Sequence, residues 1–304
     1  MNLTSQDQDE LTSRARLAAL FAIGSLWLHL YFTIYPTWIA SPYYDYAWFV
    51  PPLAIFLFYR RWEERKELVI LGSIDRLMVV GAVLLFPFLV VVRILGGVDE
   101  LWRLPMTLYT GVVTCATLVI LNFMGGRTLA LKVIPVVVFA LSAIPLPSFL
   151  ETSIINGLTN LVVESSGKIF QLLGKQVDVV GGVIQYYGTK VEVTEGCSGI
   201  QSFQSLVMVS LYFGEFFRLR IPHRFFIIAT ACVVSIVVNI GRAVWLAQVR
   251  FTRGEEAFNG IHDQVGHIAF VVGSLIIFVL SHMLTFTDYK KTAIRQIRHT
   301  PKER

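Results

Sequence analysis

The chain is dominated by long apolar runs that are almost free of charge and recur along nearly its whole length. Residues 77–92 and 225–238, for example, contain no Asp, Glu, Lys or Arg. A membrane-spanning helix needs roughly 20 predominantly apolar residues, and these runs suit that length. We therefore predict an all-α polytopic membrane protein with about eight transmembrane helices. The predicted spans are residues 17–35, 46–59, 77–95, 104–123, 129–147, 198–217, 225–249 and 266–286.

The long connection at residues 148–197 has a different pattern. Its first half places apolar residues at helical spacing with polar residues between them, which predicts an amphipathic helix in the membrane interface. A long turn of a buried core helix is the alternative. In the second half the spacing shifts towards two, and glycines at 181, 182 and 188 interrupt a series of valines, which predicts short strands. We expect a small extracytoplasmic cap within a single integral membrane domain, residues 1–304.

Composition supports a membrane protein. Hydrophobic residues make up 55% of the chain and charged residues 15%, whereas a soluble domain has about 25% charged residues. No small-residue cleavage site follows the first span, so we expect that span to be retained rather than removed as a signal peptide.

The distribution of positive charge predicts the orientation. Cytoplasmic loops of membrane proteins are enriched in Lys and Arg. With both termini in the cytoplasm, eighteen of the 26 Lys and Arg residues fall in inner segments and seven in outer segments. We therefore predict a multi-pass protein of the inner (plasma) membrane with residues 148–197 outside. The same bias accounts for the net charge of +5, so no nucleic-acid partner is expected.

This topology brings three chemically distinctive residues to the outer leaflet. Cys197 precedes a span that runs inwards, and His262 precedes the last span. Arg242 lies roughly 10 Å below the outer interface, at 1.5 Å of rise per helical residue. Cys115 and Cys232 fall in the middle of apolar runs, where a lone cysteine is usually a small hydrophobic residue.

Each of the three residues suits acyl transfer. A thiol at a helix N-terminus is favoured as the nucleophilic thiolate, and a neighbouring cation has the same effect. An arginine within a span is costly and marks a cavity or a partner; Asn239, on the same helical face as Arg242, can hold it or the substrate. His262 can accept the thiol proton and later protonate a leaving amine, while Arg242 binds the oxyanion.

Plainer interpretations stay open at this point. Cys197 can be an isolated cysteine, and Arg242 can extend to the lipid headgroups. His262, beside Asp263 in a polar loop between the last two predicted spans, can be an ordinary surface residue. His267 competes for the histidine role.

Three short blocks strengthen the enzymatic interpretation. They are Glu195–Ser202 (EGCSGIQS), Asn239–Arg242 (NIGR) and His262–Gly266 (HDQVG). Together, in this order and at these places in the topology, they resemble the signature blocks of the exosortase/archaeosortase family over roughly residues 75–286. The resemblance implies Cys197 as nucleophile, with Arg242 and His262 as the other catalytic residues. The supporting or substrate-binding residues it implies are Glu195, Ser198, Gly199, Gln201, Asn239, Asp263 and Gly266.

The resemblance implies a membrane cysteine protease or transpeptidase. Its partners would be exported proteins that end in a short motif, a transmembrane helix and a basic tail, and a membrane lipid or glycan would accept the product. Gln201 and His267 depart from the exosortase pattern, and archaeosortases tend to have Arg where this chain has His262, so the subfamily is left open.

Two other functions remain alternatives. The same triad would serve a membrane thiol acyltransferase acting on lipid or glycan, and a transporter or assembly scaffold would need no triad at all. No metal or organic cofactor is expected, because the sequence has no Cys/His cluster at ligand spacing and no glycine-rich phosphate loop.

Overall fold

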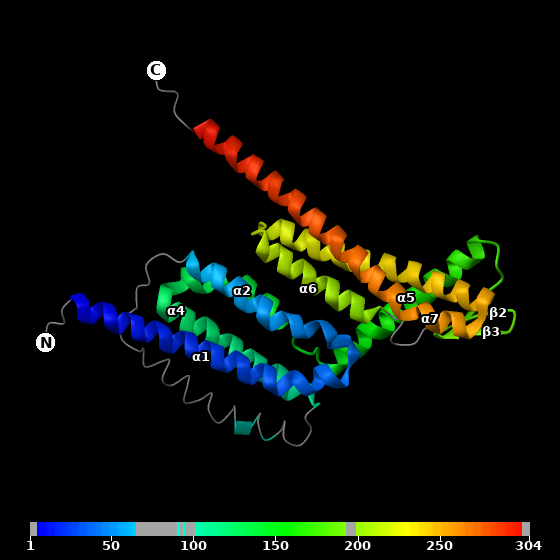
Figure 1. Ribbon diagram of the computed structural model, residues 1–304, viewed down its shortest axis with the longest axis horizontal. Helices are drawn as coiled ribbons and strands as arrows, with labels where there is room; N and C mark the ends of the chain where they lie inside the picture. The colour runs from blue at the N-terminus through cyan, green and yellow to red at the C-terminus, as the bar shows by residue number, and fades with distance from the viewer. Residues whose placement is uncertain (1–4, 65–89, 92–93, 95–100, 193–198, 300–304) are drawn as a thin grey trace. The chain divides into compact units, whose positions relative to one another are not determined.

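The computed structural model describes residues 5–64, 90–91, 94, 101–192 and 199–299 (Figure 1). The chain forms two compact units, Met1–Ser148 and Phe149–Arg304, and each is described here by itself. Apolar helices dominate both units, as predicted for an all-α membrane protein. The predicted span at 77–95 lies almost entirely outside the described residues.

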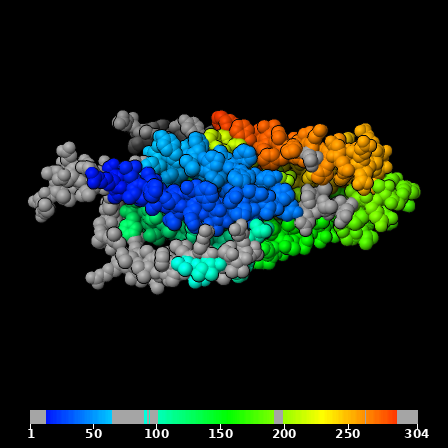
Figure 2. Space-filling model, turned by 60° about the horizontal axis from the view of Figure 1, so that its bottom comes forward, coloured from blue at the N-terminus to red at the C-terminus, as the bar shows by residue number. Residues whose placement is uncertain are grey.

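The described part of the first unit is mostly helical. It contains α1 (Ser5–Ala40), the 3-10 helix η1 (Pro42–Phe49), α2 (Val50–Glu63) and α4 (Arg103–Leu141). In Figure 2, α1 and α2 form one continuous blue surface. A side-chain hydrogen bond joins α1 to α4: Nε1 of Trp27 donates to Oγ1 of Thr117 at 3.0 Å.

Two predicted spans of this unit differ from the helices observed. The spans predicted at 104–123 and 129–147 are two parts of α4, interrupted at Gly125 and Gly126, where φ of Gly126 is +68°. The helix ends at Leu141 rather than at 147. The two prolines that follow, at 145 and 147, explain the early end, because the residue before a proline is disfavoured in helical conformation.

The second unit contains the predicted cap. Helix α5 (Ser148–Leu172) is followed by β1 (Asp178–Val180), β2 (Val183–Tyr186) and β3 (Thr189–Glu192), which form an antiparallel sheet in the order β1-β2-β3. The amphipathic helix and the short strands predicted for 148–197 are therefore present. Whether this segment is extracytoplasmic, and whether 1–304 is one domain, stay predictions.

Two further helices complete the second unit, α6 (Ile200–Phe216) and α7 (Ile221–His299). Helix α7 consists of two arms that lie side by side, the first drawn in yellow and the second in orange in Figure 1. Between them lies Gly254, whose φ of +84° and ψ of −173° break the helix. A buried cluster of Leu206, Ala231 and Ile277 joins α6 to both arms.

The prediction of a polar loop between the last two spans is wrong. Residues 255–265 continue as helix, so His262 lies on the second arm of α7 rather than in a loop. The polar residues here end the apolar run without ending the helix, because Gly254 alone supplies the left-handed backbone conformation that reverses the chain.

Four helical segments of the described residues are long and apolar enough to cross a membrane. They are Ser13–Ala40, Arg103–Leu141, Ile221–His262 and Gln264–Thr287. Helix α6 matches the span predicted at 198–217 closely but has 17 residues. The structure thus supports a multi-pass membrane protein, and the number of eight spans remains a prediction.

The cap is joined to α7 by a shared hydrophobic core. Residues from α5, the sheet and the first arm of α7 bury one another; they are Val162, Val163, Phe170, Val177, Ile184, Val191, Ala243 and Ala247. At the edge of this core the Lys175 ammonium lies 5.5 Å from the Phe170 ring and 5.4 Å from the Tyr186 ring, and donates to Oε1 of Gln248. The cap therefore packs on the stretch of α7 that also carries Arg242.

Candidate active site

The N-terminus of α6 approaches α7 so closely that it leaves room for glycine alone. Gly199 caps α6 with φ of +84°, a conformation that costs other residues about 1–2 kcal/mol. A Cβ atom at this position would lie 2.5 Å from Cγ and Nδ2 of Asn239. Asn239 itself is 4% exposed and therefore has little freedom to move away. The structure thus places Gly199, two residues after Cys197 in sequence, directly against Asn239.

Arg242 meets His262 across the two arms of α7. Nη2 of Arg242 lies 3.2 Å from Nε2 of His262. A guanidinium has donors and no acceptor, so Nε2 accepts this hydrogen bond and the imidazole proton resides on Nδ1. Two of the three residues that the topology was expected to bring together are therefore in direct contact, although they are 20 positions apart.

Gly266 lies beside the same guanidinium. A Cβ atom at Gly266 would be 3.5 Å from both Cζ and Nη2 of Arg242, an ordinary van der Waals distance, so the glycine lines the Arg242 side chain without being sterically required. Nε of Arg242 is buried and has no hydrogen-bond partner among the described residues. A buried donor without a partner is costly, and such a donor is suited to an acceptor that arrives with a substrate.

The remaining predicted site residues fall into two groups. Gln201 and His267 are exposed, on α6 and on the second arm of α7 respectively. Glu195, Cys197 and Ser198 lie outside the described residues, and of Asp263 only the backbone, in α7, is described. The structure therefore joins Gly199 to Asn239 and Arg242 to His262, and the roles of all these residues stay predictions.

The sequence interpretation missed a group of residues at the turn between the arms of α7. Arg250 contacts Glu255, Phe258 and the backbone of β3, whereas the charge pattern marked it as one more outer basic residue. Phe258 and His262 are four positions apart. A helical interpretation of this segment would therefore have placed their side chains on one face. The end of the apolar run was the misleading signal.

Comparison with protein families identifies the class of protein. The model of the transmembrane exosortase family matches residues 38–279, which include Arg242, His262 and Cys197. The chain therefore belongs to the transmembrane exosortase family, as its three sequence blocks predicted. Members of this family are membrane cysteine transpeptidases that act in protein sorting, on exported proteins with C-terminal sorting signals. No curated protein and no solved structure matches the chain significantly.

Proposed function

We propose that this protein is a membrane cysteine transpeptidase whose nucleophile is Cys197 and whose other catalytic residues are Arg242 and His262. It cleaves the C-terminal sorting signal of an exported protein and transfers the protein to a lipid or glycan acceptor. The observation that carries the proposal is the 3.2 Å contact between Arg242 and His262. These two residues occupy the positions that the resemblance to the family blocks implies are catalytic.

The N-terminus of α6 supplies the second part of the argument. Two residues of extended chain span at most about 7 Å between Cα atoms, and Gly199 lies directly against Asn239. Asn239 precedes Arg242 by one helical turn on α7. The proposal therefore requires Cys197 to lie within reach of the Arg242–His262 pair, and the covalent chain permits this.

The reaction follows from the hydrogen-bonding capacities of these groups. Nε2 of His262 takes the proton of the Cys197 thiol, and the thiolate attacks the scissile carbonyl carbon. Once Nε2 is protonated it no longer accepts from Arg242, so the Nη2 donor of Arg242 becomes available to the oxyanion that forms. Collapse of the tetrahedral intermediate breaks the C–N bond, and His262 returns its proton to the leaving amine.

The product of this first half is a thioester on Cys197. A hydroxyl or amine of the acceptor then attacks the thioester carbonyl, its proton passes to His262, and the thiol is restored on release of the product. Hydrolysis would use water in the same step, so transfer and cleavage share one mechanism.

We also propose that the chain spans the membrane eight times, with both termini cytoplasmic and the site outside. Support comes from the bias of Lys and Arg towards the segments assigned inside. A membrane-impermeant maleimide should label Cys197 from outside in intact cells, while Cys115 and Cys232 stay protected. Labelling of Cys197 only after the membrane is permeabilised would reverse the orientation.

Replacement of the nucleophile tests the mechanism. Cys197→Ala should abolish processing of an exported protein that ends in a short motif, a hydrophobic helix and a basic tail. Cys197→Ser should be nearly as inactive, because its hydroxyl has a far higher pKa than a thiol. Accumulation of the unprocessed protein is measured in cells, with the amount of each variant in the membrane checked by immunoblot.

The two histidines provide a matched comparison within the same test. His262→Ala should lose processing, whereas His267→Ala, which removes an exposed imidazole from the same arm, should retain it. Normal processing by well-expressed Cys197→Ala would overturn the cysteine mechanism and favour a scaffold. Loss of acyl transfer to a lipid or glycan with no effect on any exported protein would favour a thiol acyltransferase.

A further inference from the structure

The turn between the two arms of α7 is organised around the side chain of Arg250. Nη2 of Arg250 lies 3.2 Å from Oε2 of Glu255, and its Nε donates to the carbonyl oxygen of Lys190 at 3.2 Å. The guanidinium carbon also lies 5.4 Å from the centroid of the Phe258 ring. A planar guanidinium with five donors can make these contacts together. Arg250 thereby joins the first arm of α7, the second arm and strand β3.

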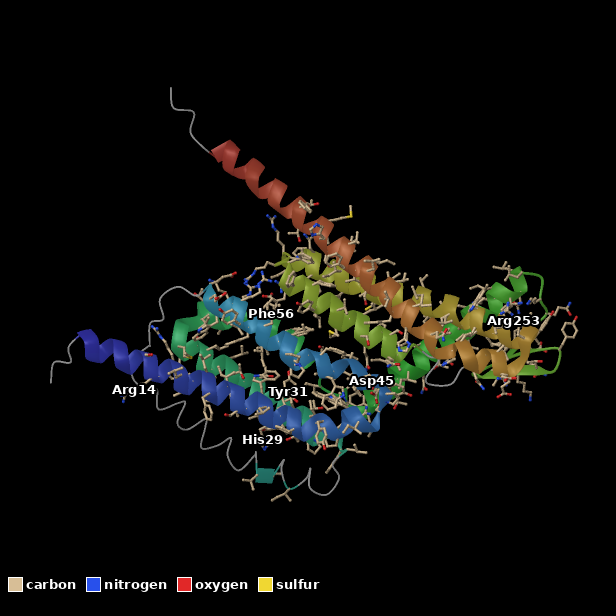
Figure 3. All side chains as sticks on the ribbon, in the orientation of Figure 1. Arg14, His29, Tyr31, Asp45, Phe56 and Arg253 are labelled. Carbon is tan, nitrogen blue, oxygen red and sulfur yellow. The ribbon has the colours of Figure 1, made fainter. Side chains whose placement is uncertain are left out.

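Stability alone does not account for this arrangement. The Glu255 side chain is 70% exposed, and exposed ion pairs contribute little to the free energy of folding because water and salt screen them. What the contacts do fix is orientation, since they hold three separate segments to one rigid planar group. Figure 3 labels the neighbouring Arg253, which is exposed, at the turn between the arms of α7.

A short chain of contacts leads from Arg250 to the candidate site. The Phe258 ring, which the Arg250 guanidinium covers, lies 5.5 Å from the His262 imidazole at an interplanar angle of 48°. Phe258 and His262 are one helical turn apart and share a face of the second arm. His262 in turn accepts the hydrogen bond of Arg242. The position of Phe258 therefore limits the orientations that the imidazole can adopt.

The contact with β3 leads to the other half of the site. Lys190, whose carbonyl oxygen accepts the Arg250 hydrogen bond, lies in β3. That strand ends at Glu192, five residues before Cys197. One side chain thus touches both the segment that leads to the proposed nucleophile and the arm that carries the proposed base.

We infer that Arg250 is a positioning residue, which holds Phe258 against His262 and sets the relative placement of β3 and the second arm of α7. This inference rests on the proposed function of Cys197, Arg242 and His262. Arg250 takes no proton and touches no substrate; it acts through His262. Its loss therefore lowers the reactivity of the site without removing any reacting group.

The test measures the reactivity of Cys197 directly, with iodoacetamide as the probe. The full-length protein, with Cys115 and Cys232 replaced by alanine, is purified in detergent and its alkylation rate is followed against pH. Arg250→Ala should slow alkylation at neutral pH about tenfold, since small misplacements of catalytic groups have effects of this order or larger. The pH of half-maximal rate should rise, because a thiol less well placed beside the Arg242 guanidinium ionises less readily. The matched control, Arg253→Ala, should change neither quantity.

A double-mutant cycle distinguishes positioning from general destabilisation. If Arg250 acts through His262, Arg250→Ala should have little further effect once His262 is alanine, whereas independent effects would multiply. Phe258→Leu, which keeps apolar volume and loses the ring contact, should resemble Arg250→Ala in the same cycle. If Arg250→Ala fails to accumulate, Arg250→Lys replaces it, since a point-charge ammonium cannot make the same three contacts.

The outcomes separate this inference from the proposed function. Multiplicative effects, or an unchanged alkylation rate in Arg250→Ala, would overturn the positioning role while leaving the triad intact. An unchanged alkylation rate in His262→Ala itself would instead count against the proposed mechanism.

Discussion

Two regions of the molecule use polar side chains in different ways: the segment that follows α4 in the first unit and the Arg242 site in the second. In the first unit, Nε1 of Trp38 donates to the carbonyl oxygen of Ala143 at 2.9 Å, and the hydroxyl of Tyr46 donates to that of Ser142 at 2.9 Å. In the second unit, Arg242 presents a buried Nε without a partner among the described residues. The first set joins α1 and η1 to the residues that follow α4, whereas Arg242 keeps a donor that no described residue accepts from.

The difference shows how a polar residue within a span is best judged. Polar groups in a membrane protein are costly unless paired, so a satisfied pair supports an architectural role. A charged group that keeps an unpaired donor and also contacts a second ionisable side chain, as Arg242 contacts His262, supports a functional role. The following predictions test this contrast, beginning with the largest expected effect.

The largest effect is expected when the guanidinium of Arg242 is replaced. Arg242→Lys should reduce processing by about 100-fold or more, because an ammonium cannot reproduce a planar fork that serves both His262 and an oxyanion. Processing in cells and the level of the variant are the measurements. Arg253→Lys, at an exposed position on the same arm, is the matched control and should be neutral. Full activity of Arg242→Lys would mean that positive charge alone suffices.

The close approach at Gly199 should be nearly as sensitive. Gly199→Ala places a methyl group 2.5 Å from Asn239 and forces alanine into a left-handed conformation, so processing should fall about tenfold or more as the α6 N-terminus shifts. Gly157→Ala in α5 is the control, because a Cβ there meets nothing within 4 Å and helix propensity should make it neutral or stabilising. Equal activity of the two variants would show that the contact of Gly199 with Asn239 is unimportant.

The smallest effect is expected in the first unit. The Tyr109 hydroxyl and Nδ1 of His29 are hydrogen-bonded at 2.6 Å between α4 and α1; Figure 3 labels His29 on α1. Tyr109→Phe should lower the free energy of unfolding by about 1 kcal/mol and leave processing within twofold of the original. Thermal unfolding in detergent measures the first quantity and the cell assay the second. Strong loss of processing without loss of stability would place this pair in the functional site and break the contrast.

The class of fold and most helix positions followed from hydropathy, since burial in lipid demands long apolar helices with internally satisfied backbones. The helix and strands of the cap followed from a change of period. The hydropathy pattern failed where a polar stretch is nevertheless helical. The helix beyond Gly254 carries Glu255, Glu256 and His262, and these polar residues were interpreted as a loop. Helices end where the backbone turns, and the membrane surface does not decide that position.

The candidate site was predictable in part for a similar reason. Topology placed Arg242 and His262 at the same depth, and the structure brings them into contact. The close approach of Gly199 and Asn239 depends on a packing distance between two helices, which no pattern of residue types specifies. The contacts of Arg250 could not be predicted, because its partners come from β3 and from a segment that was not expected to be helical.

The hairpin of α7 has a consequence for the order in which the site is assembled. Arg242 and His262 are separated by 20 positions, and contacts so local in sequence carry a small entropic cost of loop closure. Local contacts also form early in folding, ahead of pairings between distant segments. The Arg242–His262 pair can therefore form as soon as both arms of α7 are in place, before any contact with more distant segments is made.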